Sequence, residues 1–175
     1  MRMSGLRRSV NLLLLAWPHM AAAEGVLTVT DVGIFCPYDR NGSIAAPDTV
    51  MGSVDLIDDH PVDVHSTTVP AHLQLAFGAR FRLVEGVPDQ LATMIFTHPP
   101  MGPTGATRQS WESTLFAGNN GLSTYRFDLP DELVLGLWTL QIEVDGQRVF
   151  YQEYNIVPPE QAAMAIDVCF GGLTS

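Results

Sequence analysis

The stretch that decides the fold is GLWTLQIEVDGQRVFYQEYNIV, residues 136–157. Its first half alternates large apolar side chains with polar ones, which is the period of a strand with one buried face. Asp145-Gly146 follows, and Asp-Gly between two such runs is a strong hairpin signal because both turn positions need positive φ. The returning strand runs from Arg148 to Val157. The sequence therefore predicts an antiparallel hairpin here.

Working outward, the same alternation marks further strands. From His72 to Val84, most odd positions carry a large apolar side chain, which predicts a strand with one dry face. A second hairpin is expected where a strand from Trp111 to Phe116 meets Asn119-Asn120-Gly121 and a strand through Tyr125. Less regular strands are expected at residues 26–35, 52–57 and 91–98.

About seven to eight strands with few helices between them predict an all-β, antiparallel sandwich. Pro158-Pro159 and the helix formers after them predict a short C-terminal helix, which would carry Cys169 to the sheet. Residues 99–110 are rich in proline and glycine and are expected to form an irregular loop, either functional or merely mobile.

Residues 1–23 have the order of a secretory signal peptide, with cleavage expected before Glu24. A basic start, a short apolar stretch and small residues follow one another: Arg2, Arg7 and Arg8, then Val10 to Trp17, then Ala21 to Ala23. The apolar stretch is too short to span a bilayer. Residues 24–175 are thus expected to form one exported domain, periplasmic or secreted, without a transmembrane segment. Both the general and the twin-arginine routes remain open.

The expected mature domain is strongly acidic. Cleavage would remove three of the nine basic residues and none of the 19 acidic ones, leaving six arginines and a net charge near −13. An acidic surface repels phosphate backbones, so nucleic acid is not expected as a partner. The two cysteines, Cys36 and Cys169, are most simply a disulfide in an oxidising compartment, because they form an even pair without a CxxC motif.

Four short features resemble an uncharacterised bacterial family known as a domain of unknown function, DUF 3859. They are Val32-Gly33-Ile34-Phe35, Gly78-Ala79-Arg80-Phe81, Thr97-His98-Pro99-Pro100 and Gly136-Leu137-Trp138. The resemblance covers about residues 26–157, and the segment from Leu129 to Ile142 is similar to the late strands of bacterial immunoglobulin-like domains. It implies a secreted immunoglobulin-like sandwich and carries no catalytic residue across.

Two groups of side chains are candidates for metal ligands. The acidic run from Asp55 to His65 contains carboxylates and imidazoles that would have to converge on one ion: His60, His65, Asp58 and Asp63. Its spacing matches no calcium loop, so a solvated acidic loop is the competing interpretation. His98 with nearby methionines suits copper, but methionines also fill apolar cores.

Trp111 and Arg108 are candidates for a recognition patch, together with His98. An aromatic ring beside a guanidinium suits binding, although a tryptophan at a strand start also packs simply against a core. No nucleophile elbow or phosphate loop is present in the sequence, so no catalytic residue is assigned and no cofactor is expected.

These observations favour a non-catalytic binding or assembly module, whose partner would be another periplasmic protein or an unknown ligand. The alternatives are a metal-handling protein and a hydrolase with a composite site assembled in three dimensions.

Overall fold

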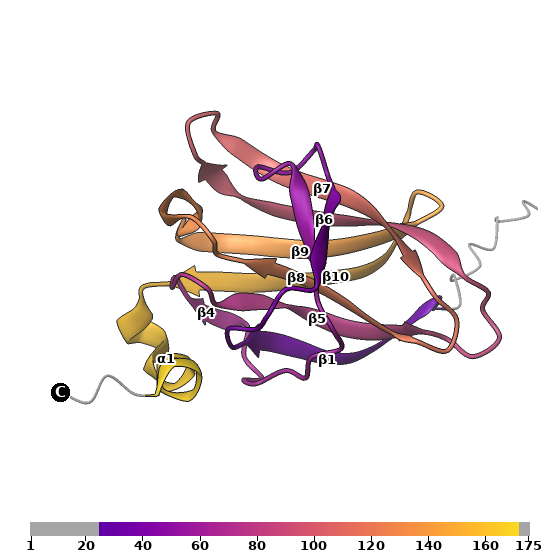
Figure 1. Ribbon diagram of the computed structural model, residues 1–175, viewed down its shortest axis with the longest axis horizontal. Coiled ribbons are helices and arrows are strands. Elements are labelled where there is room, and N and C mark those ends of the chain that lie inside the picture. Colours follow the sequence, from indigo (N-terminus) through magenta and orange to yellow (C-terminus); the bar gives the residue numbers. More distant parts are fainter. Residues whose placement is uncertain (1–24, 172–175) are drawn as a thin grey trace, which may run out of the picture.

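The computed structural model describes residues 25–171, and in that part of the chain ten strands build the fold (Figure 1). The strands are β1 Leu27–Phe35, β2 Gly42–Ala45, β3 Ser53–Leu56, β4 Thr68–Pro70, β5 Ala76–Leu83, β6 Gln90–Met101, β7 Ala106–Leu115, β8 Asn120–Arg126, β9 Gly136–Val144 and β10 Gln147–Val157. The helical elements are η1 Pro130–Glu132, η2 Pro159–Ala162 and α1 Ala163–Phe170. The expected signal peptide and its cleavage site lie outside the described residues.

Two sheets of unequal size form an antiparallel sandwich. The smaller sheet has the order β1-β5-β8 and the larger the order β4-β10-β9-β6-β7, with only the short β4 parallel to its neighbour. Strands β2 and β3 pair only with each other and belong to neither sheet. The predicted fold class is therefore confirmed, with a separate hairpin added to it.

The core lies between the two sheets and is dominated by aromatic rings. Phe77 on β5 packs edge-on against Trp138 on β9, with ring centroids 5.6 Å apart, and Tyr154 on β10 lies 4.9 Å away. Trp138 is fully buried, and its indole N–H donates to the carbonyl of Val134 at 2.9 Å. Burial of these alternating side chains supplies most of the driving force for folding.

The hairpin predicted at residues 136–157 is confirmed as β9–β10. Its turn residues have the positive φ that an Asp-Gly turn requires, 52° at Asp145 and 69° at Gly146. Strand β5 begins later than predicted, at Ala76, because Gln74 has a φ of 69° and turns the chain just before it.

The second predicted hairpin is wrong. Strand β7 pairs with β6 in the larger sheet, whereas β8 pairs with β5 in the smaller one. The turn at Phe116–Asn119 is real, since the Asn119 N–H donates to the Phe116 carbonyl at 3.2 Å. It carries the chain from one sheet to the other, because alternation marks a strand's buried face and not its partner.

The irregular loop predicted at residues 99–110 is also wrong. Strand β6 continues to Met101, and β7 begins at Ala106 after a tight turn. Proline has no N–H to donate, so within a sheet it is confined to edge strands, strand starts and irregular places. Pro99 and Pro100 lie at such a place, a register shift between Thr97 and Met101.

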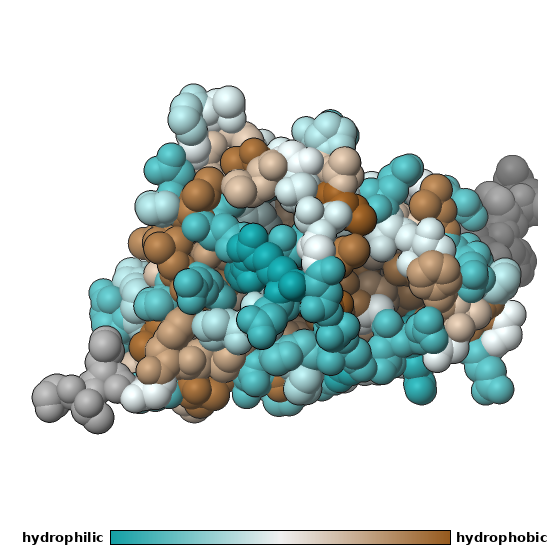
Figure 2. All heavy atoms as spheres, in the orientation of Figure 1, coloured by the Kyte–Doolittle hydropathy of each residue, from teal (hydrophilic) through white to brown (hydrophobic). Residues whose placement is uncertain are grey.

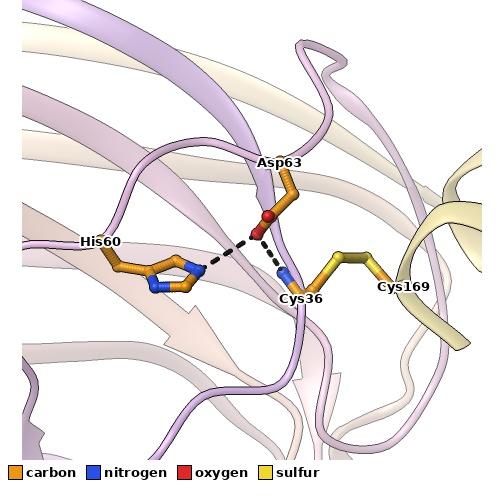
Figure 3. The surroundings of a disulfide bond; sticks show 4 residues. All are labelled: Cys36, His60, Asp63 and Cys169. Atoms are coloured by element: carbon orange, nitrogen blue, oxygen red, sulfur yellow. Dashed lines mark hydrogen bonds and ion pairs between the residues drawn. A yellow bond between two sulfur atoms is a disulfide. The ribbon is translucent and has the colours of Figure 1, made fainter.

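The predicted C-terminal helix and disulfide are both confirmed. Helix α1 brings Cys169 to Cys36 at the end of β1, and the two form a disulfide (Figure 3). The Asp63 carboxylate accepts the Cys36 N–H at 2.8 Å and also faces His60 at 3.2 Å. Within residues 25–171, no helix has the length and apolar character needed to cross a membrane.

A substitution at Gly78 tests the pairing of β5 with β8. A Cβ at this position would overlap the carbonyl oxygen of Ser123, which is backbone and cannot rotate away. We expect Gly78→Ala to lower the free energy of unfolding by about 1–3 kcal/mol, measured by urea denaturation. Gly25→Ala is the control, because its methyl would meet only a carbonyl oxygen at 3.6 Å. Equal urea midpoints for Gly78→Ala and Gly25→Ala would contradict the register between β5 and β8.

Candidate functional site

The candidate site is the open side of the sandwich, where the edge strands β7 and β8 are not joined by any sheet. The β2–β3 hairpin crosses this side, as the purple ribbon in front of the strands in Figure 1. It reaches both edges: the Asp48 carbonyl accepts the Ser110 N–H of β7 at 3.3 Å, and Asp55 on β3 pairs with Arg126 on β8 at 3.1 Å.

Four charged side chains anchor the hairpin to β8. Asp55 Oδ2 lies 3.1 Å from Arg126 Nη2 and 3.1 Å from Arg40 Nε. Asp128 Oδ1 completes the square, at 2.9 Å from Arg126 Nε and 2.7 Å from Arg40 Nη2. The Arg126 side chain is only 9% exposed, so its positive charge is compensated by the two carboxylates rather than by water. We call these four residues the ion-pair square.

Tyr38 packs beside the ion-pair square. The Arg126 guanidinium carbon lies 5.4 Å from the centroid of the Tyr38 ring, a cation–π distance. The Tyr38 hydroxyl shares a 3.2 Å hydrogen bond with Thr124. Burial raises the pKa of Tyr38 to about 12, so it remains a neutral phenol at any physiological pH.

A chain of buried hydrogen bonds links the hairpin loop to η1. Gln109 Oε1 accepts the Val50 N–H at 2.8 Å, and Gln109 Nε2 donates to the Tyr125 hydroxyl at 3.1 Å. The Tyr125 hydroxyl in turn donates to Glu132 Oε1 at 3.0 Å. The loop between β2 and β3 is thereby tied through β7 and β8 to the turn before β9.

Glu132 ends this chain as a structural acceptor. Its Oε2 accepts the N–H groups of Asp128 at 2.6 Å and Leu129 at 2.8 Å, and the residue is only 2% exposed. Burial raises the pKa of Glu132 above its ordinary value. Both carboxyl oxygens already have partners, so the side chain is poorly placed to exchange protons with a ligand.

Two clefts remain between the hairpin and the edge strands. One holds about 650 Å³ of space, part of it open to solvent, and is lined by Gln109, Tyr125 and the ion-pair square. The other holds about 680 Å³ and is lined by Ile44, Asp58 and Leu122. Trp111 lines both. Figure 2 shows this face, with hydrophilic side chains gathered near its centre around the lower end of the hairpin.

The structure separates the residues of the predicted recognition patch. Trp111 points inward, and its ring stacks on Phe96 at 5.9 Å, whereas Arg108 is exposed and donates to Ser110 Oγ at 2.8 Å. Alternation along β7 places them on opposite faces. His98 is buried against Trp138 at 4.6 Å, where burial lowers its pKa. Of the three, only Trp111 lines the clefts.

The four residues predicted to hold a metal do not converge. His60 and Asp63 meet at 3.2 Å, but His65 faces Asp31 instead, at 3.8 Å, and Asp58 lies in the second cleft. Within the described chain, no group of three or more His, Cys, Asp or Glu side chains is arranged to hold a metal ion.

Sequence reasoning missed most of this site. The sequence places Asp55 in the acidic run and indicates no role for Arg40, Arg126 or Asp128. Their positions span almost ninety residues of sequence, so only the fold brings them together. Gln109 and Glu132 gave no signal either, because single polar residues in strands and turns are usually exposed.

Comparison with known proteins identifies a family and a solved structure of similar fold. A family model described as "Domain of unknown function (DUF3859)" matches residues 24–156. An immunoglobulin-like protein from Pseudomonas aeruginosa has 21% identity and a TM-score of 0.51, covering 77% of this chain and 99% of its own. No curated protein sequence matches the chain.

Two other solved structures are similar only at TM-scores below 0.5 and carry no argument. An alkylpurine DNA glycosylase from Pseudomonas fluorescens has 12% identity and a TM-score of 0.30, covering 47% of this chain and 25% of its own. A β-D-glucoside glucohydrolase from Trichoderma reesei has 11% identity and a TM-score of 0.35, covering 75% of this chain and 19% of its own.

Glu132→Gln tests the buried acceptor through its pH dependence. The glutamine amide oxygen can still accept the N–H groups of Asp128 and Leu129, and the variant buries no charge at this position. Because the pKa of Glu132 is raised on folding, the ionised carboxyl costs stability above its folded pKa, and acid relieves that cost. The free energy of unfolding of the variant minus that of the wild type should therefore increase as pH rises from about 4 to 7.

Urea denaturation across this range measures the difference. Asp131→Asn, which removes an exposed carboxyl from the same turn, controls for the lost charge. A constant difference between Glu132→Gln and wild type, or one that grows as pH falls, would refute a raised pKa.

Proposed function

The chain belongs to the DUF3859 family of domains of unknown function, and from this premise we propose that it is an exported, non-catalytic binding module. Its ligand would bind at the open side of the immunoglobulin-like sandwich, in the clefts beneath the β2–β3 hairpin. The ligand-contacting residues would include Trp111, Tyr38 and Gln109.

One observation carries this proposal: the hairpin is held above the open side without filling it. Strands β2 and β3 add nothing to either sheet, yet the ion-pair square and Gln109 hold them in place. Two clefts stay open beneath them. A domain that needed only stability would gain more from closing this side with apolar side chains.

The lining of the clefts also suits recognition. An aromatic ring, guanidinium groups, carboxylates and a buried amide converge on one concave surface. Binding sites typically combine an apolar or aromatic floor with a few polar groups held in fixed positions. Here Trp111 provides the aromatic surface, and hydrogen bonds hold the side chains of Tyr38 and Gln109 in fixed positions.

Binding is favoured over hydrolysis at this site because its buried groups are already engaged. Glu132 accepts three hydrogen bonds, and Tyr125 lies between it and Gln109. A general acid or base needs a free position toward the substrate. Export is proposed from the signal-like order of residues 1–23, and the Cys36–Cys169 disulfide supports it because such bonds persist in oxidising compartments.

Fluorescence of Trp111 tests the proposal. The panel of probes would be free amino acids, short oligosaccharides, and basic, neutral and acidic hexapeptides. In the domain without residues 1–23, which lacks Trp17, at least one class should change the emission saturably, because Trp111 lines both clefts while Trp138 is fully buried. Trp111→Phe should abolish this response and leave the unfolding midpoint nearly unchanged, since phenylalanine keeps the contact with Phe96. No saturable response to any class, or the same response in Trp111→Phe, would refute the proposed site.

A further inference from the structure

We infer that the ligand of the open side is an extended, basic segment of another protein, which pairs with the edge strand β7 as an added β-strand. This inference rests on the proposed function and names the partner of the same site. It follows from the free edge of β7, the shape of the clefts and the charge of the residues that line them.

The outer edge of β7 is almost unpaired. This strand has ten residues, and its partner on one side is β6. On the other side, the described chain makes one backbone hydrogen bond to it, from the Ser110 N–H to the Asp48 carbonyl. An edge with free N–H and C=O groups is a template for another strand.

The orientation of this single bond identifies the free donors. In a strand, the N–H groups of alternate residues point to the same edge. The Ser110 N–H points away from β6, so those of Glu112 and Thr114 do so too. The N–H groups of Trp111 and Ser113 then face β6, opposite Met94 and Ala92. An added strand would therefore bind Glu112 and Thr114.

The clefts form a row along β7. The first is lined by Gln109 and Trp111, and the second by Trp111 and Ser113. A third, of about 440 Å³ including space open to solvent, is lined by Ser113 and Leu115. Strand β8 supplies the opposite wall of all three. Six residue steps from Gln109 to Leu115 span about 20 Å, so the row fits an extended segment of about six residues rather than a compact ligand.

Acidic side chains outnumber basic ones along this row. Five carboxylates line the three clefts, Asp55, Asp58, Asp59, Asp128 and Glu132, against three guanidinium groups, Arg40, Arg82 and Arg126. Asp58 is exposed and lines the second cleft. Lysine or arginine side chains on the incoming segment would meet this charge. A second copy of the chain is disfavoured because it would bring its own strongly negative charge.

The probe for this inference is an eight-residue peptide of alternating lysine and valine, added to the full mature domain with its disulfide intact. On binding, hydrogen exchange by NMR should show new protection at the amides of Glu112 and Thr114. Trp111 and Ser113 should change little, since β6 already protects them. A twin peptide that is N-methylated at every residue should bind about tenfold more weakly or worse, because it has lost its donors.

Matched variants separate pairing from charge. Thr114→Pro removes one outward N–H, a position where an edge strand tolerates proline, and should weaken peptide binding about tenfold. Asp58→Asn should weaken it severalfold, whereas Glu160→Gln, an equal charge change on an exposed residue of η2, should not.

Equal affinity of the N-methylated twin, or protection that misses Glu112 and Thr114, would overturn strand addition. If another probe class still alters Trp111 fluorescence, the proposed function survives that failure. If no probe does, both fail. Protection of the same two amides in concentrated protein without peptide would assign the edge to a second copy and also overturn the inference.

Discussion

The ion pair between Asp55 and Arg126 is the contact on which the open side depends. It joins a hairpin that belongs to neither sheet to an edge strand of the sandwich, over a distance of 3.1 Å. The Arg126 side chain is 9% exposed, so losing Asp55 would leave its largely buried charge paired with Asp128 but no longer with Asp55, at a cost on the order of 1–3 kcal/mol because water partly reaches the pair. Without this pair, the hairpin would keep its loop contacts with Gln109 and Ser110 and the link from Asp55 through Arg40 to Asp128.

The need for such an anchor arises from the unequal sheets. Three strands face five, and the chain crosses from one sheet to the other at Phe116–Asn119 instead of forming a hairpin there. This crossing leaves β7 and β8 as neighbouring edges with no shared ladder. Edges of this kind are a liability that proteins cover or charge. Here an acidic hairpin covers them without closing the space beneath, and this arrangement leaves the clefts in which we propose that a ligand binds.

Local patterns predicted the parts of the fold that local physics determines. Alternation at Trp138 to Val144 and the Asp145-Gly146 turn identified the β9–β10 hairpin, and simple cysteine pairing identified the Cys36–Cys169 disulfide. The strand partners of β7 and β8 could not be read in this way, because alternation is the same in either sheet. The ion-pair square was equally hidden, since Arg40 and Asp128 meet only after the sandwich has formed. Of the predicted site residues, Trp111 and Asp58 line the clefts, while Arg108 and His98 lie elsewhere.

Hydrogen exchange in Asp55→Asn tests most directly whether the ion-pair square holds the hairpin over the open side. Asparagine has nearly the same shape but cannot neutralise two guanidinium groups. Residues 42–56 should then exchange about tenfold faster or more than in the wild type, while the core strands β5 and β9 keep their protection. Unchanged protection across residues 42–56, or an equal loss throughout the sandwich, would contradict the role of Asp55 as the anchor.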